Sequence, residues 1–183
     1  SDVYKRQHIE CAKQLGSCPL CRREFISDLF HKAEDFSELM RQGRELESVK
    51  SYDTALQYYT KATELDNSKA IGWAAKANLL CRMGRYREAL EDYERALEAR
   101  PEDLGILYNK ALAHLNLGMY ADALECLNEA LRVDAMYQKA WYLKGKIFYK
   151  EGKNIVAAKC LQKALDILPE DYRAWFVRGQ ALE

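Results

Sequence analysis

The chain has 183 residues, enough for one domain or for an array of small repeated units. Its 28 lysines and arginines balance its 28 aspartates and glutamates, so the net charge indicates neither a nucleic-acid partner nor an anionic membrane surface. Apolar runs are only a few residues long, far short of the ~20 residues that cross a bilayer. We therefore expect a soluble chain without a membrane or nucleic-acid partner.

The chain opens with SDVYKRQ, which has neither an apolar core nor a small-residue cleavage site, and so is not a secretory signal. This string also lacks an initiator methionine and resembles translated adapter sequence, so we interpret residues 1–7 as foreign and the chain as a fragment. Of the six cysteines, three lie close together near the start and three are scattered through sequence of helical pattern. This usage predicts a reducing, intracellular compartment and a cytoplasmic location.

The segment 1–26 contains a candidate metal site. Four side chains stand in metal-ligand spacing: His8, Cys11, Cys18 and Cys21. Zinc takes four such ligands in a closed tetrahedral structural site, and a Cys-x-x-Cys turn directs two thiolates at one ion. The sequence therefore predicts zinc as the cofactor.

The strings HIEC and CPLCRREF in this segment resemble the second half of a RING finger with two histidines. The resemblance implies two cross-braced zinc ions, one held by His8 and Cys11 and the other by Cys18 and Cys21, each with two partners upstream. It also implies a contact with a ubiquitin-conjugating enzyme through Pro19, Leu20 and Arg22. On this interpretation the full-length protein is a ubiquitin ligase and the fragment is inactive. Another zinc finger and a chance match are the alternatives.

Residues 27–35 are predicted to be a helical join that leads into the next region without a flexible linker. Apolar residues recur here at helical spacing, and Ser27 or Asp28 is available as an N-cap. His31 on this helix is expected at the surface.

Residues 36–183 contain an internal repeat with a period of about 34 residues. Five columns keep this spacing without an insertion, including a small-residue column at Gly43, Ala77, Ala111, Gly145 and Gly179. Within each unit the apolar residues follow helical spacing twice. Gly84, Gly118 and Gly152 stand where a first helix would end, and Pro101 and Pro169 stand at unit boundaries. Each unit is therefore predicted to be an antiparallel helix hairpin.

The pattern from Trp141 through Gly145, Ala157, Leu161 and Pro169 resembles the tetratricopeptide repeat (TPR). The resemblance implies an all-α, right-handed superhelix of four full repeats and part of a fifth. A basic column, Lys76, Lys110, Lys144 and Arg178, departs from the family pattern. We expect these side chains to cover helix junctions with their aliphatic stems. Cys126 and Cys160 are expected to be buried without a disulfide, and His114 is expected at the surface.

The first helices of such an array line a groove that holds an extended peptide. The predicted groove residues are Asn78, Tyr108, Asn109, Lys139, Tyr142 and Lys146. Some family members clamp an acidic chaperone tail with five polar residues. The corresponding positions here hold Ala74, Asn78, Asn109, Lys139 and Leu143, so the first lysine and the last arginine of that clamp are missing.

Three functional interpretations remain open. The chain is an interaction scaffold, a scaffold within a RING-type ubiquitin ligase whose repeats recruit a substrate or partner, or a chaperone adaptor with a purely structural zinc finger. No arrangement of residues indicates a self-contained catalytic site.

Overall fold

The structure is a computed structural model that describes residues 35–182. Every regular element in this range is an α-helix, as the repeat pattern predicts. The chain forms two compact units that divide between Asp66 and Asn67. Among the described residues, no helix is long and apolar enough to cross a membrane.

The described part of the first unit, from residue 35 onward, holds one helix hairpin, whose two helices are residues 35–48 and α3 (Tyr52–Leu65). Gly43 lets these helices approach closely, because a Cβ atom on it would lie 2.5 Å from the Tyr59 ring. Tyr59 is fully buried, and its hydroxyl donates to Glu47 at 2.8 Å. A glycine that faces an aromatic ring therefore sets the spacing of this hairpin.

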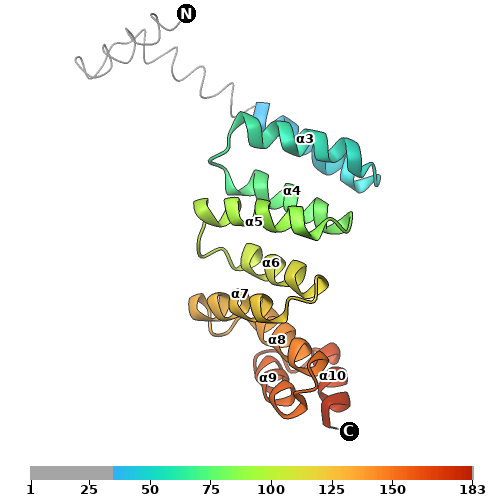
Figure 1. The fold of residues 1–183 in the computed structure, drawn as a ribbon, viewed down its shortest axis with the longest axis vertical. Helices are drawn as coiled ribbons and strands as arrows, with labels where there is room; N and C mark the ends of the chain where they lie inside the picture. Colours follow the sequence, from blue (N-terminus) through green and yellow to red (C-terminus); the bar gives the residue numbers. More distant parts are fainter. Residues whose placement is uncertain (1–34, 183) are drawn as a thin grey trace, which may run out of the picture. The chain divides into compact units, whose positions relative to one another are not determined.

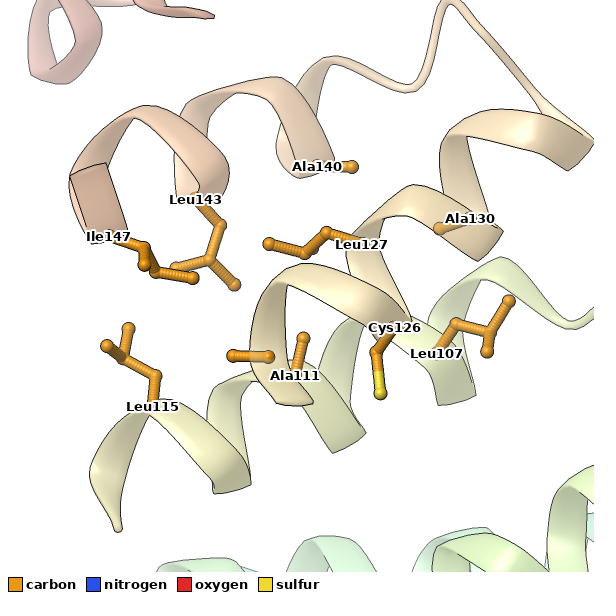
Figure 2. Packing of buried hydrophobic residues seen from close by; sticks show 10 residues of the cluster. Leu107, Ala111, Leu115, Cys126, Leu127, Ala130, Ala140, Leu143 and Ile147 are labelled. Atoms are coloured by element: carbon orange, nitrogen blue, oxygen red, sulfur yellow. The ribbon is translucent and has the colours of Figure 1, made fainter. Parts of the chain in front are cut away.

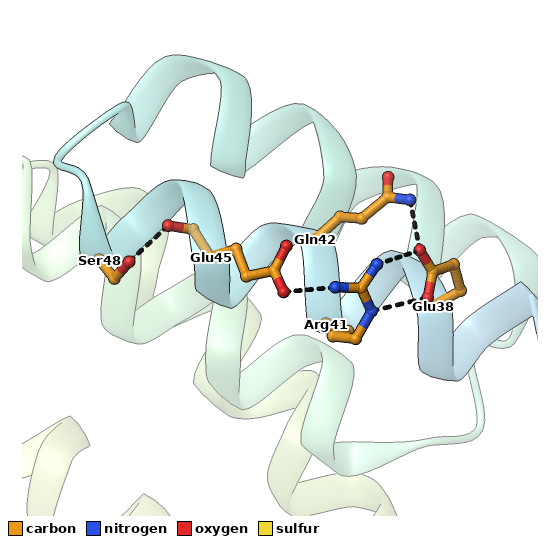
Figure 3. A network of polar contacts seen from close by, with 5 residues as sticks. All are labelled: Glu38, Arg41, Gln42, Glu45 and Ser48. Carbon is orange, nitrogen blue, oxygen red and sulfur yellow. Dashed lines mark hydrogen bonds and ion pairs between the residues drawn. The ribbon is translucent and has the colours of Figure 1, made fainter.

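The outer surface of the 35–48 helix carries a polar network centred on Arg41 (Figure 3). Arg41 donates to both carboxylate oxygens of Glu38, at 2.8 and 2.6 Å, and also pairs with Glu45. The hydrogen bonds from Arg41 and Gln42 lower the pKa of Glu38 to about 2. All these side chains are at least partly exposed, so solvent screens the pairs and they add little to stability.

The second unit consists of three helix hairpins and one further helix (Figure 1). Its helices are α4 (Ala70–Arg82), α5 (Tyr86–Ala99), α6 (Leu104–Asn116), α7 (Tyr120–Val133), α8 (Gln138–Lys150), α9 (Asn154–Ile167) and α10 (Tyr172–Leu182). The hairpins are α4/α5, α6/α7 and α8/α9, and α10 packs against α9 and α8.

A glycine in the left-handed region ends the first helix of each hairpin in the second unit. Gly84, Gly118 and Gly152 have φ angles of 77°, 75° and 74°. The amide of the residue after each glycine donates to the carbonyl five residues earlier, at 2.9 Å in all three turns. This is the pattern of a Schellman cap, which reverses the chain after the helix. The predicted positions of the turns are confirmed.

The core of the second unit is built from alanine and leucine side chains at the helix crossings. The cluster in Figure 2 joins α6, α7 and α8 through Leu107, Ala111, Leu115, Ala123, Cys126, Leu127, Ala130, Ala140, Leu143 and Ile147. The repeated alanines of this cluster are fully buried, because a small side chain lets two helices pack closely. Cys126 and Cys160 are buried free thiols, as expected.

Tryptophans close the loops that precede two of the three hairpins of the second unit. The indole N–H of Trp73 donates to the Asn67 carbonyl at 2.9 Å, and that of Trp141 donates to the Ala135 carbonyl at 2.8 Å. In the α6/α7 hairpin Leu107 takes the place of tryptophan, and Asp103 caps α6 instead by accepting from two backbone amides. The tryptophans therefore fix the loops before α4 and α8, and Asp103 fixes the start of α6.

Each lysine of the basic column has a polar partner on a neighbouring helix. Lys76 pairs with Asp92 at 3.2 Å, Lys110 with Glu94 at 3.3 Å, and Lys144 donates to Asn128 at 2.6 Å. The Lys76 and Lys110 side chains are only 20% and 17% exposed.

One expectation about this unit is wrong. His114, expected at the surface, is buried with 8% of its area exposed. It stands one repeat after Leu80 and one repeat before Phe148, and so occupies a column of apolar residues. The position in the repeat, and not the polarity of imidazole, decides its burial.

Candidate peptide-binding surface

The first helices of the second unit lie side by side. The helix α4 contacts α6, α6 contacts α8, and α8 contacts α10, whereas no pair among the second helices α5, α7 and α9 is in contact to the same extent. We call the exposed side chains of α4, α6, α8 and α10 the first-helix surface. All six residues predicted to line the groove lie on three of these helices: Asn78, Tyr108, Asn109, Lys139, Tyr142 and Lys146.

An amide pair joins α4 to α6 on this surface. The Asn109 side chain donates from Nδ2 to Oδ1 of Asn78 at 2.9 Å, and the buried Tyr93 hydroxyl donates to the same oxygen at 2.6 Å. Among the described residues, Nδ2 of Asn78 and Oδ1 of Asn109 have no hydrogen-bond partner. The pair therefore presents one donor group and one acceptor, which is what an extended peptide backbone can bind.

Lys139, Tyr142 and Lys146 lie on one face of α8, since they are three and four residues apart. Lys139 is exposed and Lys146 is half-buried. Neither lysine forms an ion pair within residues 35–182. An ammonium group without a protein partner is available to an anionic ligand.

Aromatic side chains also lie on or next to these first helices. The rings of Tyr108 and Tyr137 meet edge to face, with centroids 6.1 Å apart. Burial raises the pKa of Tyr108, so its hydroxyl stays neutral. The Arg173 guanidinium, on α10, lies over the Tyr142 ring at 5.4 Å from the centroid.

Sequence reasoning missed Arg173. It donates from Nε and from Nη2 to the two oxygens of Asp171, both at 3.0 Å, and Gln138 also donates to Asp171 at 2.8 Å. The Arg173 hydrogen bond is the main reason why the pKa of Asp171 is lowered. Arg173 stands one repeat after Lys139, so the repeat itself could have identified it.

The two cations missing from the family clamp have different structural settings. Ala74 is half-buried on α4 and leaves its position without charge. Leu143 is 1% exposed and belongs to the core cluster of Figure 2. In this chain, the position of the last clamp arginine is therefore a packing position.

The predicted zinc ligands His8, Cys11, Cys18 and Cys21 lie outside the described residues, as do Pro19, Leu20 and Arg22. Within residues 35–182 no group of histidine, cysteine, aspartate and glutamate side chains is arranged to hold a metal ion. Neither the metal site nor the contact with a conjugating enzyme is tested by the structure.

Comparison with known families agrees with the geometry of the hairpins. Tetratricopeptide-repeat models match residues 39–69 and, in three overlapping stretches, residues 74–131, 108–154 and 142–183. The chain belongs to the tetratricopeptide-repeat family.

Several curated TPR relatives match over part of the chain. Human sperm-associated antigen 1 is 26% identical over 106 residues, which are 58% of this chain and 11% of that protein. The Hsp70-Hsp90 organizing protein of Triticum aestivum is 41% identical over 49 residues, or 27% of this chain and 8% of that protein. The matched region spans about a tenth of the length of these relatives.

Solved structures share the fold. The MamA protein superposes with a TM-score of 0.74 at 19% identity, covering 81% of each chain. The first TPR domain of Spaghetti (RPAP3), bound to the HSP90 peptide SRMEEVD, gives a TM-score of 0.60 at 26% identity, covering 64% of this chain and 93% of that one. YrrB, a TPR protein with an unusual peptide-binding site, gives 0.67 at 25% identity, covering 86% and 81%. A right-handed superhelix over the whole array stays a prediction.

Proposed function

We propose that this TPR chain is a protein-interaction scaffold whose first-helix surface binds an extended peptide of acidic character. The observation that carries the proposal is the Asn78–Asn109 pair, which presents a donor and an acceptor on α4 and α6, with the exposed Lys139 on α8. The two amides suit the peptide backbone, and Lys139 suits a carboxylate. The peptide complex of the Spaghetti domain, a structure of the same fold, supports a peptide as the kind of ligand.

A fluorescence anisotropy titration with an array of acidic peptides, SRMEEVD among them, tests the proposal. Lys139→Gln should weaken binding of the best acidic peptide by about 1.5–3 kcal/mol, the usual contribution of a charge-assisted hydrogen bond. Asn109→Ala should weaken binding of acidic and neutral peptides alike, because it removes a backbone contact. Lys159→Gln, which removes an exposed lysine from the second helix α9, is the matched control and should have no effect.

Unchanged binding in both Lys139→Gln and Asn109→Ala, with both variants folded by circular dichroism, would place the ligand elsewhere. A chaperone tail is one acidic peptide of this kind, and an adaptor role for the chain is the narrower form of the same proposal. Preference for SRMEEVD over other acidic peptides in the array would favour that narrower form.

The His8, Cys11, Cys18 and Cys21 spacing favours a second candidate function. We propose that these residues bind zinc and that the segment derives from a RING-type ubiquitin ligase. The present chain should hold at most one zinc ion weakly, since the resemblance implies four further ligands upstream, and should not transfer ubiquitin. Elemental analysis after dialysis checks this: Cys18→Ser with Cys21→Ser should abolish zinc binding. Zinc that persists in the double variant would contradict the ligand assignment.

A further inference from the structure

The C-terminal end of the first-helix surface carries an arginine whose orientation is fixed before any ligand binds. Arg173 uses Nε and Nη2 to contact Asp171, and its guanidinium lies over the Tyr142 ring. The Asp171 side chain is 2% exposed, whereas that of Arg173 is 55% exposed. The carboxylate therefore holds the guanidinium from beneath and does not itself reach the surface.

The remaining nitrogen of this guanidinium is available. Among the described residues, Nη1 of Arg173 has no hydrogen-bond partner. A planar guanidinium held in one orientation loses little conformational entropy when it binds a carboxylate. Asp171 offsets part of its charge, so the contact gives orientation and discrimination more than long-range attraction.

Arg173 and Lys139 occupy equivalent places in successive first helices, because they are one repeat apart. Beside them runs an aromatic column with the same spacing, made of Tyr108, Tyr142 and Phe176. Phe176 is 65% exposed. The cation and aromatic columns therefore occupy neighbouring register positions on α8 and α10, which contact each other, and the Arg173 guanidinium reaches across to the Tyr142 ring.

The spacing of these columns fits a particular ligand. Packed helix axes are about 8–10 Å apart, so Lys139 and Arg173 start from backbones at roughly that separation. An extended peptide in the polyproline II conformation rises ~3.1 Å per residue with three residues per turn, and presents residues i and i+3 on one side about 9 Å apart. Two acidic side chains at this separation match the two cations, and the apolar residue between them can contact Tyr142 and Phe176.

We propose that Arg173 is a second anion-binding residue of this surface, and that the ligand carries acidic side chains at positions i and i+3, one bound by Lys139 and the other by Arg173. This inference rests on the proposed peptide-binding function and extends it to the α10 end of the array. In this chain Arg173 on α10 would supply the cation that the family clamp has at the position of Leu143 on α8.

The peptide SRMEEVD is a suitable probe, since its first glutamate and its aspartate are three residues apart. Three C-terminally amidated peptides would be titrated by anisotropy: SRMEEVD, SRMQEVD and SRMEEVN, so that only side-chain carboxylates differ. Arg173→Gln should weaken SRMEEVD about tenfold, the effect of one charge-assisted contact. One of the other two peptides lacks the carboxylate that Arg173 binds. For that peptide, Arg173→Gln should cause no further loss of affinity.

Two variants serve as controls. Arg132→Gln removes an exposed arginine from the second helix α7 and should change nothing. Arg173→Lys keeps the charge but loses the planar group, and should retain part of the affinity. A role of Arg173 limited to holding the start of α10 predicts a lower melting temperature without a change in discrimination among the peptides.

The outcomes separate this inference from the proposed function. Weaker binding in Lys139→Gln with unchanged binding in Arg173→Gln would overturn the inference and leave the function standing. Equal loss for all three peptides in Arg173→Gln would also overturn it, because the contact would not involve a carboxylate. Failure of the unaltered chain to bind SRMEEVD would overturn it too, while other acidic peptides of the array still test the function.

Discussion

At the scale of the residue, the pair Lys76–Asp92 shows how burial and charge compete. Both Asp92 oxygens lie 3.2 Å from the Lys76 ammonium, and the Asp92 side chain is 7% exposed. Burial nevertheless raises the pKa of Asp92, with Lys76 acting in the opposite direction. Burial therefore outweighs the ion pair: Lys76 offsets only part of the desolvation of the Asp92 carboxylate, and the pair adds little to stability.

The equivalent positions in the next two hairpins give a way to test this balance. They hold Cys126 and Cys160, which are buried and uncharged, in place of Asp92. Lys76→Met should lower the free energy of unfolding by about 2–3 kcal/mol, because it leaves a buried carboxylate without its cation. Lys76→Met combined with Asp92→Cys should recover most of the loss. Urea denaturation of the unaltered chain, the two single variants and the double variant gives the coupling free energy between Lys76 and Asp92. Simple additivity of the single effects would mean that the pair does not act as a unit.

His114 makes the stability of the second unit depend on pH. It is buried, and its Nδ1 has no hydrogen-bond partner among the described residues. Burial is the main reason why the pKa of His114 is lowered; Lys110 also lowers it, and Asp122 and Glu94 oppose the shift. The unfolded chain therefore takes up a proton near the ordinary pKa of histidine while the folded chain resists it. Stability is complete above that pKa and falls as the pH decreases through it.

We expect the melting temperature to fall more steeply between pH 7.5 and pH 5 in the unaltered chain than in His114→Leu. Leucine suits the site because Leu80 occupies the equivalent position one repeat earlier and is buried. Thermal melts of both chains in matched buffers check this. Parallel curves over the whole range would assign the pH dependence to other groups.

At the scale of the element, the part of the small-residue column in the second unit contains two glycines in different surroundings. A Cβ atom on Gly145 would lie 2.6 Å from Leu161 Cγ and 3.2 Å from the Ala157 carbonyl oxygen. A Cβ atom on Gly179, one repeat later, would meet nothing within 4 Å. Gly145 is needed because α9 packs tightly on α8, whereas α10 has no following helix against this position in the structure.

The same substitution should therefore have opposite effects at the two sites. Gly145→Ala should destabilise the second unit by about 1–3 kcal/mol through overpacking, despite the better helix propensity of alanine. Gly179→Ala should stabilise α10 by up to about 1 kcal/mol, because only the propensity changes. Chemical denaturation measures both. Destabilisation of similar size at both positions would show that another segment covers Gly179 in solution.

How much of each element could be predicted depends on whether the repeat specifies it. The hairpins and their turns follow from the column of Gly84, Gly118 and Gly152, because each needs a left-handed residue at a fixed place. The burial of His114 was missed because its residue type was weighed above its position in the repeat, and the contacts of Arg173 were missed because the cation column was not continued into α10. The bond between Asn78 and Asn109 depends on how two helices approach each other, and spacing along the chain does not encode that distance.

At the scale of the whole molecule, the second unit has a one-dimensional organisation in which each hairpin packs mainly on its sequence neighbours. Stability in such an array is shared across the interfaces between neighbours. The α6/α7 hairpin has a neighbour on each side, α5 before it and α8 after it. Damage to this middle hairpin should therefore reach both flanks.

Ala123→Trp tests this sharing of stability. Ala123 is fully buried in the core cluster of Figure 2, so an indole there must displace packed side chains, at a cost of about 1–3 kcal/mol or more. Native-state hydrogen exchange should show lower protection in α4/α5 and in α8/α9 as well as in α6/α7. Ala121→Trp, on the exposed side of the same helix, is the matched control and should leave protection unchanged. Coupled repeats transmit a local defect to the neighbours that pack on it. Loss of protection confined to α6 and α7 would therefore show that the hairpins are stable independently.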